Sequence, residues 1–121
     1  MSEELESPAA VSYKGQAFEL AETDEFHYWL DSLVNRRAAT RIVDRIKRAS
    51  NGNFGDAKSV GSGVSEMRID YGPGYRVYFF RRGKALVVLL CGGDKGSQRA
   101  DIAKAIRMKN EIEESGEAKT V

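Results

Sequence analysis

Cysteine, histidine and long apolar runs are scarce in this sequence of 121 residues. The single cysteine, Cys91, excludes a disulfide within the chain, and the single histidine, His27, lies far from it, so no zinc-ligand spacing is present. The longest apolar run, residues 85–91, has the length of a strand and is too short to span a membrane. Residues 1–6 contain three glutamates and no hydrophobic signal region. We therefore expect a cytoplasmic protein without a membrane segment, metal ion or cofactor.

The net charge of +1 conceals an uneven distribution along the chain. Residues 1–11 and residues 111–121 each carry a net charge of −3, so residues 12–110 carry +7. A basic body of this size attracts polyanions, and nucleic acid is the first candidate, although many soluble domains carry a similar excess. We predict a disordered lead over residues 1–11, one domain over residues 12–110, and a frayed tail over residues 111–121.

The first half of the chain has the pattern of one strand followed by two helices. Phe18 and Leu20 lie on one face of an alternating segment and predict a strand over residues 16–21. Thr23 has the position of a helix N-cap. The apolar residues that follow it have the helical spacing i, i+3, i+4, i+7: Phe26, Trp29, Leu30 and Leu33. A second amphipathic helix extends to about Arg48, and two short adjacent helices of this kind predict a helical hairpin.

The second half of the chain predicts three strands and a final helix. Residues 64–71 alternate, residues 72–74 (GPG) form a turn, and residues 75–82 return, which is the pattern of a β-hairpin. Residues 85–91 are apolar on both faces, as in a central strand. Ser97 can cap a last helix. The order strand, two helices, three strands, helix predicts an α+β domain with a small antiparallel sheet packed against helices.

Five blocks between Phe26 and Ile106 together resemble one family of bacterial toxins. The blocks are residues 29–33 (WLDSL), 52–56 (GNFGD), 60–69 (VGSGVSEMRI), 71–79 (YGPGYRVYF) and 89–95 (LLCGGDK). Through them, the chain resembles the HigB-like, phage Gp49-like branch of the RelE/ParE superfamily, the addiction module killer proteins. The resemblance covers most of the chain and implies the RelE/ParE-like fold, a small antiparallel sheet with an N-terminal helical hairpin and a C-terminal helix.

The resemblance also implies a function and a partner. Such a protein is the toxin of a type II toxin–antitoxin module, and its cognate antitoxin is often a helix-turn-helix protein. RelE-like relatives are endoribonucleases that enter the ribosomal A site and cut translated mRNA. ParE-like relatives share the fold but poison DNA gyrase, so the fold leaves the activity open. A third alternative is a domain that has lost its activity and only binds RNA or an antitoxin.

Metal-free RNA cleavage uses the 2′-hydroxyl as nucleophile and needs cations at the phosphate, a proton acceptor and a proton donor. Arg76 resembles the arginine that contacts the scissile phosphate in RelE-like toxins; otherwise it is a solvated hairpin arginine. Hairpin geometry can place Arg68 beside it, unless Arg68 pairs with Glu66 or Asp70. Lys95 resembles a basic family position in a glycine-rich loop whose amides can approach a phosphate. The alternative for Lys95 is a flexible surface lysine.

The sequence leaves the proton-transferring residues open. Glu66, Asp94 and Tyr71 are the candidates for general base or acid, and Glu66 completes the predicted catalytic set of Arg76, Arg68 and Lys95. Asp101 occupies the helix position at which RelE itself has a catalytic tyrosine. The C-terminal cluster of acids and histidine of the HigB prototype is absent. His27 is expected at the boundary of the core, and Cys91 is expected inside the core.

The second predicted helix has a strongly basic side. It contains Arg37, Arg41, Arg45 and Arg48. One interpretation is a solvated helix face, and the other is a surface that binds rRNA phosphates with strong salt dependence. Because few acids oppose these arginines, we predict that they bind RNA.

Overall fold

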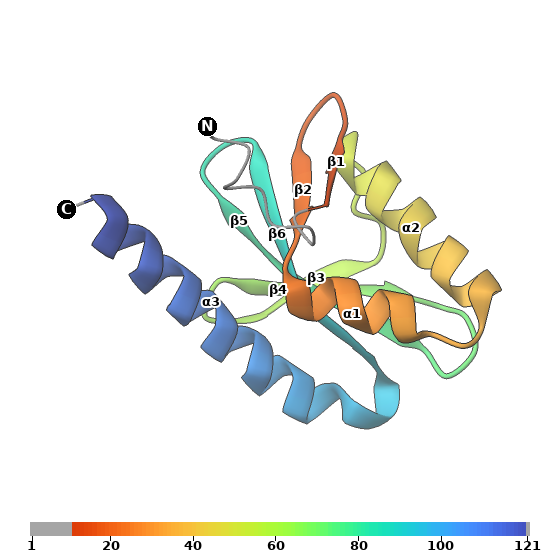
Figure 1. Cartoon of the computed structure of the whole chain (residues 1–121). Helices are drawn as coiled ribbons and strands as arrows, with labels where there is room; N and C mark the ends of the chain where they lie inside the picture. The colour runs from red at the N-terminus through yellow and green to blue at the C-terminus, as the bar shows by residue number, and fades with distance from the viewer. Residues whose placement is uncertain (1–10, 121) are drawn as a thin grey trace.

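The computed structural model describes residues 11–120, with side chains described through Ser115. Its elements are β1 Ser12–Lys14, β2 Glu19–Glu22, α1 Asp24–Ser32, α2 Arg36–Ser50, β3 Ala57–Gly61, β4 Val64–Ile69, β5 Tyr75–Arg82, β6 Leu86–Asp94, the 3₁₀ helix η2 Lys95–Ser97, and α3 Gln98–Thr120 (Figure 1). The predicted α+β class is confirmed. Residues 1–10 of the predicted disordered lead lie outside the described residues.

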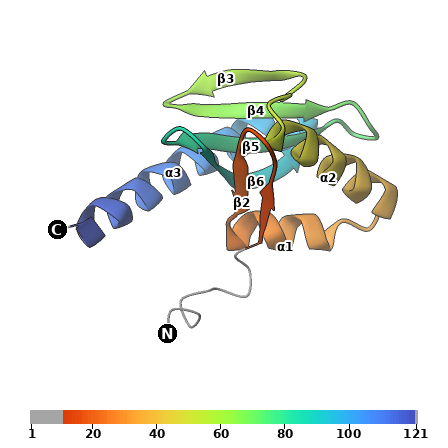
Figure 2. The same cartoon turned by 90° about the horizontal axis from the view of Figure 1, so that it is seen from above.

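The strands form one mixed sheet in the order β1-β2-β6-β5-β4-β3. The hairpin of β4 and β5 and the central strand β6 are confirmed, whereas a wholly antiparallel sheet is wrong because β2 and β6 run parallel. The long connection through α1 and α2 allows the chain to return to the sheet in the same direction. Strands β1 and β3 were not expected; they form the two edges of the sheet, and Figure 2 shows β3 at its outer side.

Helices α1 and α2 cover one face of the sheet. Thr23 caps α1 as predicted, because its hydroxyl accepts a hydrogen bond from the Phe26 amide at 3.0 Å. The core on this face includes Leu20, Phe26, Leu30, Ile42, Ile46, Met67, Val77 and Leu89. Helix α1 packs on β6, and α2 packs on β1, rather than closely on each other (Figure 1). The predicted helical hairpin is therefore not confirmed, because the sheet holds each helix separately.

Helix α3 covers the opposite face of the sheet. Its residues Ile102, Ala105 and Ile106 pack with Tyr78 and Leu90 in a second core. Since β5 and β6 have a helix on each side, both strands are buried on both faces, as predicted for β6. Residues 111–120 of the expected tail belong to this helix, and Ile112 still packs against the second core. Among the described residues, no helix combines the length and the apolar character that crossing a membrane requires.

Candidate phosphate-binding site

Arg68 and Arg76 lie directly opposite each other on the neighbouring strands β4 and β5. Both side chains lie on the α3 face of the sheet, because they alternate with Met67 and Val77, which belong to the core under α1 and α2. Like charges at opposing positions of an antiparallel pair destabilise it. The structure thus brings the two predicted arginines together on one face of the sheet.

Arg76 has a buried counterion, Glu66. The Glu66 carboxylate is fully buried, and its Oε2 lies 3.7 Å from the Arg76 Nε. The same oxygen accepts hydrogen bonds from the Tyr78 hydroxyl at 3.2 Å and from the Gln98 side-chain amide at 2.7 Å. Burial and the adjacent Glu66 raise the pKa of Tyr78, so the phenol stays protonated and remains a donor. Glu66 is therefore placed behind Arg76, out of reach of a bound substrate.

Several polar atoms in this cluster have no hydrogen-bond partner among the described residues. They are Glu66 Oε1 and the Nε atoms of Arg68 and Arg76, all of which are buried. Buried polar atoms in native proteins are nearly always hydrogen-bonded, and exceptions are frequent at functional sites. The incomplete hydrogen bonding of the two guanidinium groups therefore marks this cluster as a candidate site for an acceptor-rich ligand.

Arg68, Arg76 and Lys95 line one open depression of about 370 Å³ at the ends of β4 and β6. Gly74, with φ of +83°, lies between Arg76 and Lys95. A Cβ at this position would be 3.6 Å from the Lys95 Cβ and 3.8 Å from the Arg76 Nη1. The remaining lining residues are Asp56, Ile69 and Asp70. Three of the four predicted catalytic residues thus share one accessible site, and Glu66 lies beneath it.

Arg68 pairs with Asp56 rather than with Glu66 or Asp70. Its Nε and Nη2 lie 3.4 Å from the two carboxylate oxygens of Asp56. The Asp56 side chain is 61% exposed, and exposed ion pairs contribute little stability because water and salt screen them. A bound anion can therefore displace Asp56 from the guanidinium at small cost.

The glycine-rich loop after β6 does not offer its amides to the depression. The Asp94 side chain accepts hydrogen bonds from the amides of Gly96 at 2.9 Å and Ser97 at 3.3 Å. Together with Ser97, it forms the capping box of η2. Ser97 was predicted to cap the last helix, and it instead takes part in the cap of the 3₁₀ helix that precedes α3. Asp94 therefore occupies two of the amides that the sequence offered to a phosphate, those of Gly96 and Ser97. Lys95 itself is exposed.

The two preceding glycines serve packing. A Cβ on Gly92 would clash with the ring of Trp29, and a Cβ on Gly93 would clash with the carboxylate of Asp101. Trp29, which belongs to the predicted apolar face of α1, is only partly buried and packs against the first core. Asp101 therefore lies against the β6 backbone at Gly93.

The predicted proton-transfer residues do not line the depression. Tyr71 packs against the first core, with the Arg41 guanidinium 4.8 Å from its ring centroid. Glu66 and Asp94 have the structural roles described above. The carboxylates that do line the depression are Asp56 and Asp70, which the sequence reasoning did not choose. Asp56 is the last residue of the block 52–56, and Asp70 follows the block 60–69 directly. Their place at the ends of these family blocks is the feature of the sequence from which they could have been predicted.

The basic side of α2 contains two kinds of arginine. Arg37, Arg41 and Arg48 are exposed and remain available for a polyanion. Arg45 is partly buried: its Nη1 donates to the Arg68 carbonyl oxygen at 2.6 Å, and its Nη2 donates to the Phe54 carbonyl oxygen at 2.9 Å. The Arg45 guanidinium therefore ties the loop over residues 52–56 and strand β4 to α2, which is a structural role.

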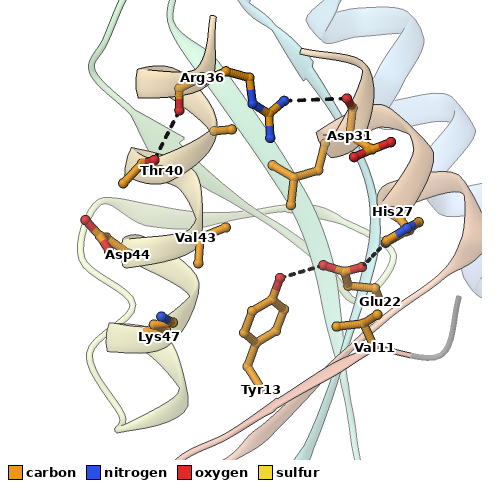
Figure 3. Close-up of a pocket in the computed structure, with 12 residues that line it drawn as sticks. Val11, Tyr13, Glu22, His27, Asp31, Arg36, Thr40, Val43, Asp44 and Lys47 are labelled. Atoms are coloured by element: carbon orange, nitrogen blue, oxygen red, sulfur yellow. Dashed lines mark hydrogen bonds and ion pairs between the residues drawn. The ribbon is translucent and has the colours of Figure 1, made fainter. Parts of the chain in front are cut away.

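A second depression, of about 320 Å³, lies between α1 and α2 (Figure 3). The buried Glu22 carboxylate accepts a hydrogen bond from the Tyr13 hydroxyl at 2.7 Å, and its other oxygen lies 2.9 Å from the His27 Nδ1. Burial and the hydrogen bond to Glu22 raise the pKa of Tyr13. His27, with a side chain 36% exposed, thus lies at the core boundary as expected. The cluster joins β1, β2 and α1, and no predicted catalytic residue lines this depression.

The fold and the site define a small α+β protein with a cationic depression at one end of its sheet. Residues 28–111 match the family model of phage-derived Gp49-like proteins, and the chain therefore belongs to this family of toxin-like proteins. An uncharacterised protein of Haemophilus influenzae is 52% identical over 87 residues, which cover 72% of this chain and 88% of the relative. No solved structure matches the chain. The family match contains all five sequence blocks and the residues Arg68, Arg76 and Lys95.

Proposed function

We propose that this chain is the toxin of a type II toxin–antitoxin module and that it cleaves mRNA on the ribosome. The observation that carries the proposal is that Arg68, Arg76 and Lys95 line one open depression. A guanidinium presents a planar fork of N–H donors that matches two oxygens of a phosphate. Membership of a toxin-like family supports the toxin role, and a cognate antitoxin, such as a helix-turn-helix protein, is its proposed partner.

The charges around the depression favour a phosphate over a neutral ligand. Three cations line it against two carboxylates, Asp56 and Asp70. Glu66 lies beside Arg76, but among the described residues the exposed Asp56 is the one counterion of Arg68. A phosphodiester in the depression supplies both negative charge and hydrogen-bond acceptors to the two guanidinium groups.

The proposed reaction is transesterification by the 2′-hydroxyl of the RNA. Asp70 accepts the proton of this hydroxyl while the 2′ oxygen forms a bond to phosphorus, and the bond from phosphorus to the 5′ oxygen breaks. The Lys95 ammonium gives a proton to the departing 5′ oxygen, so the products are a 2′,3′-cyclic phosphate and a 5′-hydroxyl. Arg68 and Arg76 stabilise the charge of the phosphorane. Glu66 positions Arg76 from behind and does not touch the substrate.

The test is a map of new RNA 5′ ends after a short pulse of expression. The wild type is expected to produce cuts in reading frame within translated messages. Arg76→Ala is expected to abolish them, and Asp70→Asn is expected to reduce them by about 100-fold or more, the usual effect of losing a general base. Arg107→Ala, which removes an exposed arginine from α3, is the matched control and should cut normally.

Folding must be separated from chemistry in this test, because Arg76→Ala leaves the buried Glu66 without its counterion. The double variant Arg76→Ala, Glu66→Gln removes both charges, and thermal melting checks that it folds. A folded double variant that still cuts would contradict the assigned role of Arg76. Growth arrest with DNA breaks and no new RNA ends would instead indicate a gyrase poison, and no arrest would indicate an inactive binding domain.

A further inference from the structure

A third depression, of about 340 Å³, lies on the α1/α2 face of the sheet, between the loop over residues 52–56 and the strands β3, β4 and β5. We propose that it binds one nucleotide of a single-stranded RNA, with the base against Phe54 and the phosphate on Arg81. The choice of RNA as the polyanion rests on the proposed function. The depression itself is separate from the phosphate-binding site, because its floor residues lie on the other face of the sheet.

The lining has a composition that differs from that of the other two depressions. It contains the aromatic rings of Phe54 and Phe79, the hydroxyls of Ser59 and Ser65, and two cations, and no carboxylate. The depression between the helices has three carboxylates, and the phosphate-binding site has two. Arg81 is exposed, and no ion pair among the described residues involves it. Lys58 lies opposite Glu66 on β4, so its side chain leaves the sheet on the α3 face. An anion with a flat apolar part, such as a nucleotide, matches this lining.

The aromatic wall is held in place before any ligand binds. The Phe54 ring stacks on the Phe79 ring, with centroids 5.1 Å apart. The rings of Phe54 and Phe18 meet in a T-shaped arrangement, with centroids 5.5 Å apart. The Phe54 carbonyl accepts the hydrogen bond from Arg45, which fixes the loop. Because Phe54 is only partly buried, part of the ring remains accessible from the depression. Bases of single-stranded RNA stack on aromatic rings presented in this way, whatever the base.

The floor and the opposite wall supply space and polar contacts. Ser59 and Ser65 lie opposite each other on β3 and β4, and their small side chains leave room above the sheet for a flat ring. A hydroxyl both donates and accepts, so it can bond the edge of any base. The Arg81 guanidinium lies 4.5 Å from the Phe18 ring centroid, which keeps the cation at the rim. The site therefore predicts binding with little preference for sequence.

The two RNA-contacting depressions adjoin at the edge of the sheet. Asp56 lines the phosphate-binding site, and the next residue, Ala57, lines the nucleotide depression. Ala57 begins β3, which is the edge strand of the sheet that residues 11–120 form (Figure 2). A single strand of RNA can therefore pass around this edge from one depression to the other. The nucleotide held against Phe54 is not the one that is cut.

The test is photo-crosslinking of the full chain to a single-stranded RNA hexamer that contains 4-thiouridine, followed by peptide mapping. The double variant Arg76→Ala, Glu66→Gln, whose folding is checked by thermal melting, is used as the background so that the RNA stays intact. Crosslinks are expected within residues 52–59, and Arg81→Glu is expected to weaken RNA binding at least tenfold. Arg107→Glu, with the same charge change on α3, is the matched control and should weaken binding less than twofold.

A second variant keeps the test independent of charge. Ser65→Met fills the floor of the depression and is expected to remove the crosslink to residues 52–59. The proposal would be overturned if an abasic hexamer bound as tightly as the RNA. It would also be overturned if Arg81→Glu and Arg107→Glu weakened RNA binding equally, because a general cationic surface would then explain the binding. Crosslinks at Phe54 without any cleavage by the wild type would uphold the nucleotide site and contradict the nuclease function, so the two failures are distinguishable.

Discussion

Replacement of Arg45 by methionine should destabilise the protein far more than replacement of a neighbouring arginine on the same helix. Arg45 donates two hydrogen bonds to main-chain carbonyl oxygens, at 2.6 Å and 2.9 Å. Hydrogen bonds that involve a charged group contribute about 1.5–3 kcal/mol each. Because the side chain is only partly buried, we expect a total loss of about 3–4 kcal/mol, at the lower end of the sum of two such bonds. Methionine retains much of the apolar volume of the side chain, so the loss reports the hydrogen bonds.

The measurement is urea unfolding followed by circular dichroism, with Arg48→Met as the matched control. Arg48 is exposed, and its replacement should change the free energy of unfolding by less than about 0.5 kcal/mol. Its effect should appear instead in ribosome binding, as a lower dependence of affinity on salt. Equal stabilities of the two variants would refute the assignment of Arg45 as a structural arginine. The loop that carries Phe54 would then need another anchor.

Two further predictions concern the core. Gly92→Ala should cost about 1–3 kcal/mol, since the added Cβ clashes with the ring of Trp29, whereas Gly96→Ala should melt close to the wild type. Burial raises the pKa of the Cys91 thiol from 9.0 to about 12. The unfolded thiol therefore ionises above about pH 9 while the folded one keeps its proton. The free energy of unfolding should fall between pH 9 and pH 12, by up to about 1.4 kcal/mol per pH unit, relative to Cys91→Ala. A constant difference between these two proteins would contradict the burial of the thiol.

The parts of the site that could be predicted from the sequence are those fixed by short-range geometry. The alternation predicted the hairpin of β4 and β5, and its period of two places both arginines on one face. The register itself comes from the loop, because residues 70–74 separate the paired Ile69 and Tyr75, whereas a turn of residues 72–74 alone would pair Asp70 with Arg76. Arg68 and Arg76 therefore meet as the hairpin pattern allowed. Thr23 likewise caps α1, because an N-cap depends only on the residues that follow it.

The features of the fold and the site that could not be predicted depend on contacts between elements that are far apart in the sequence. Glu66 has the position of a solvent-facing residue in an alternating strand, yet α3 covers that face and buries it. Strand β3 has a polar composition because it is an edge strand, so it lacks the apolar alternation that identifies strands. The parallel pairing of β2 with β6 joins residues more than 60 positions apart, and no local pattern encodes it.

The arginines of this protein all carry the same charge, but they differ in the hydrogen-bond acceptors that surround each guanidinium group. Arg45 has its two terminal nitrogens on main-chain carbonyls, so the fold itself satisfies it. Arg68 and Arg76 face each other with buried, unbonded Nε atoms and share an open depression with Lys95. Arg76 is the counterion of the buried Glu66, so the fold accounts for one of the two charges. Arg68 pairs with the exposed Asp56, which contributes little stability, so a ligand that brings its own acceptors is the better reason for a second arginine opposite the first.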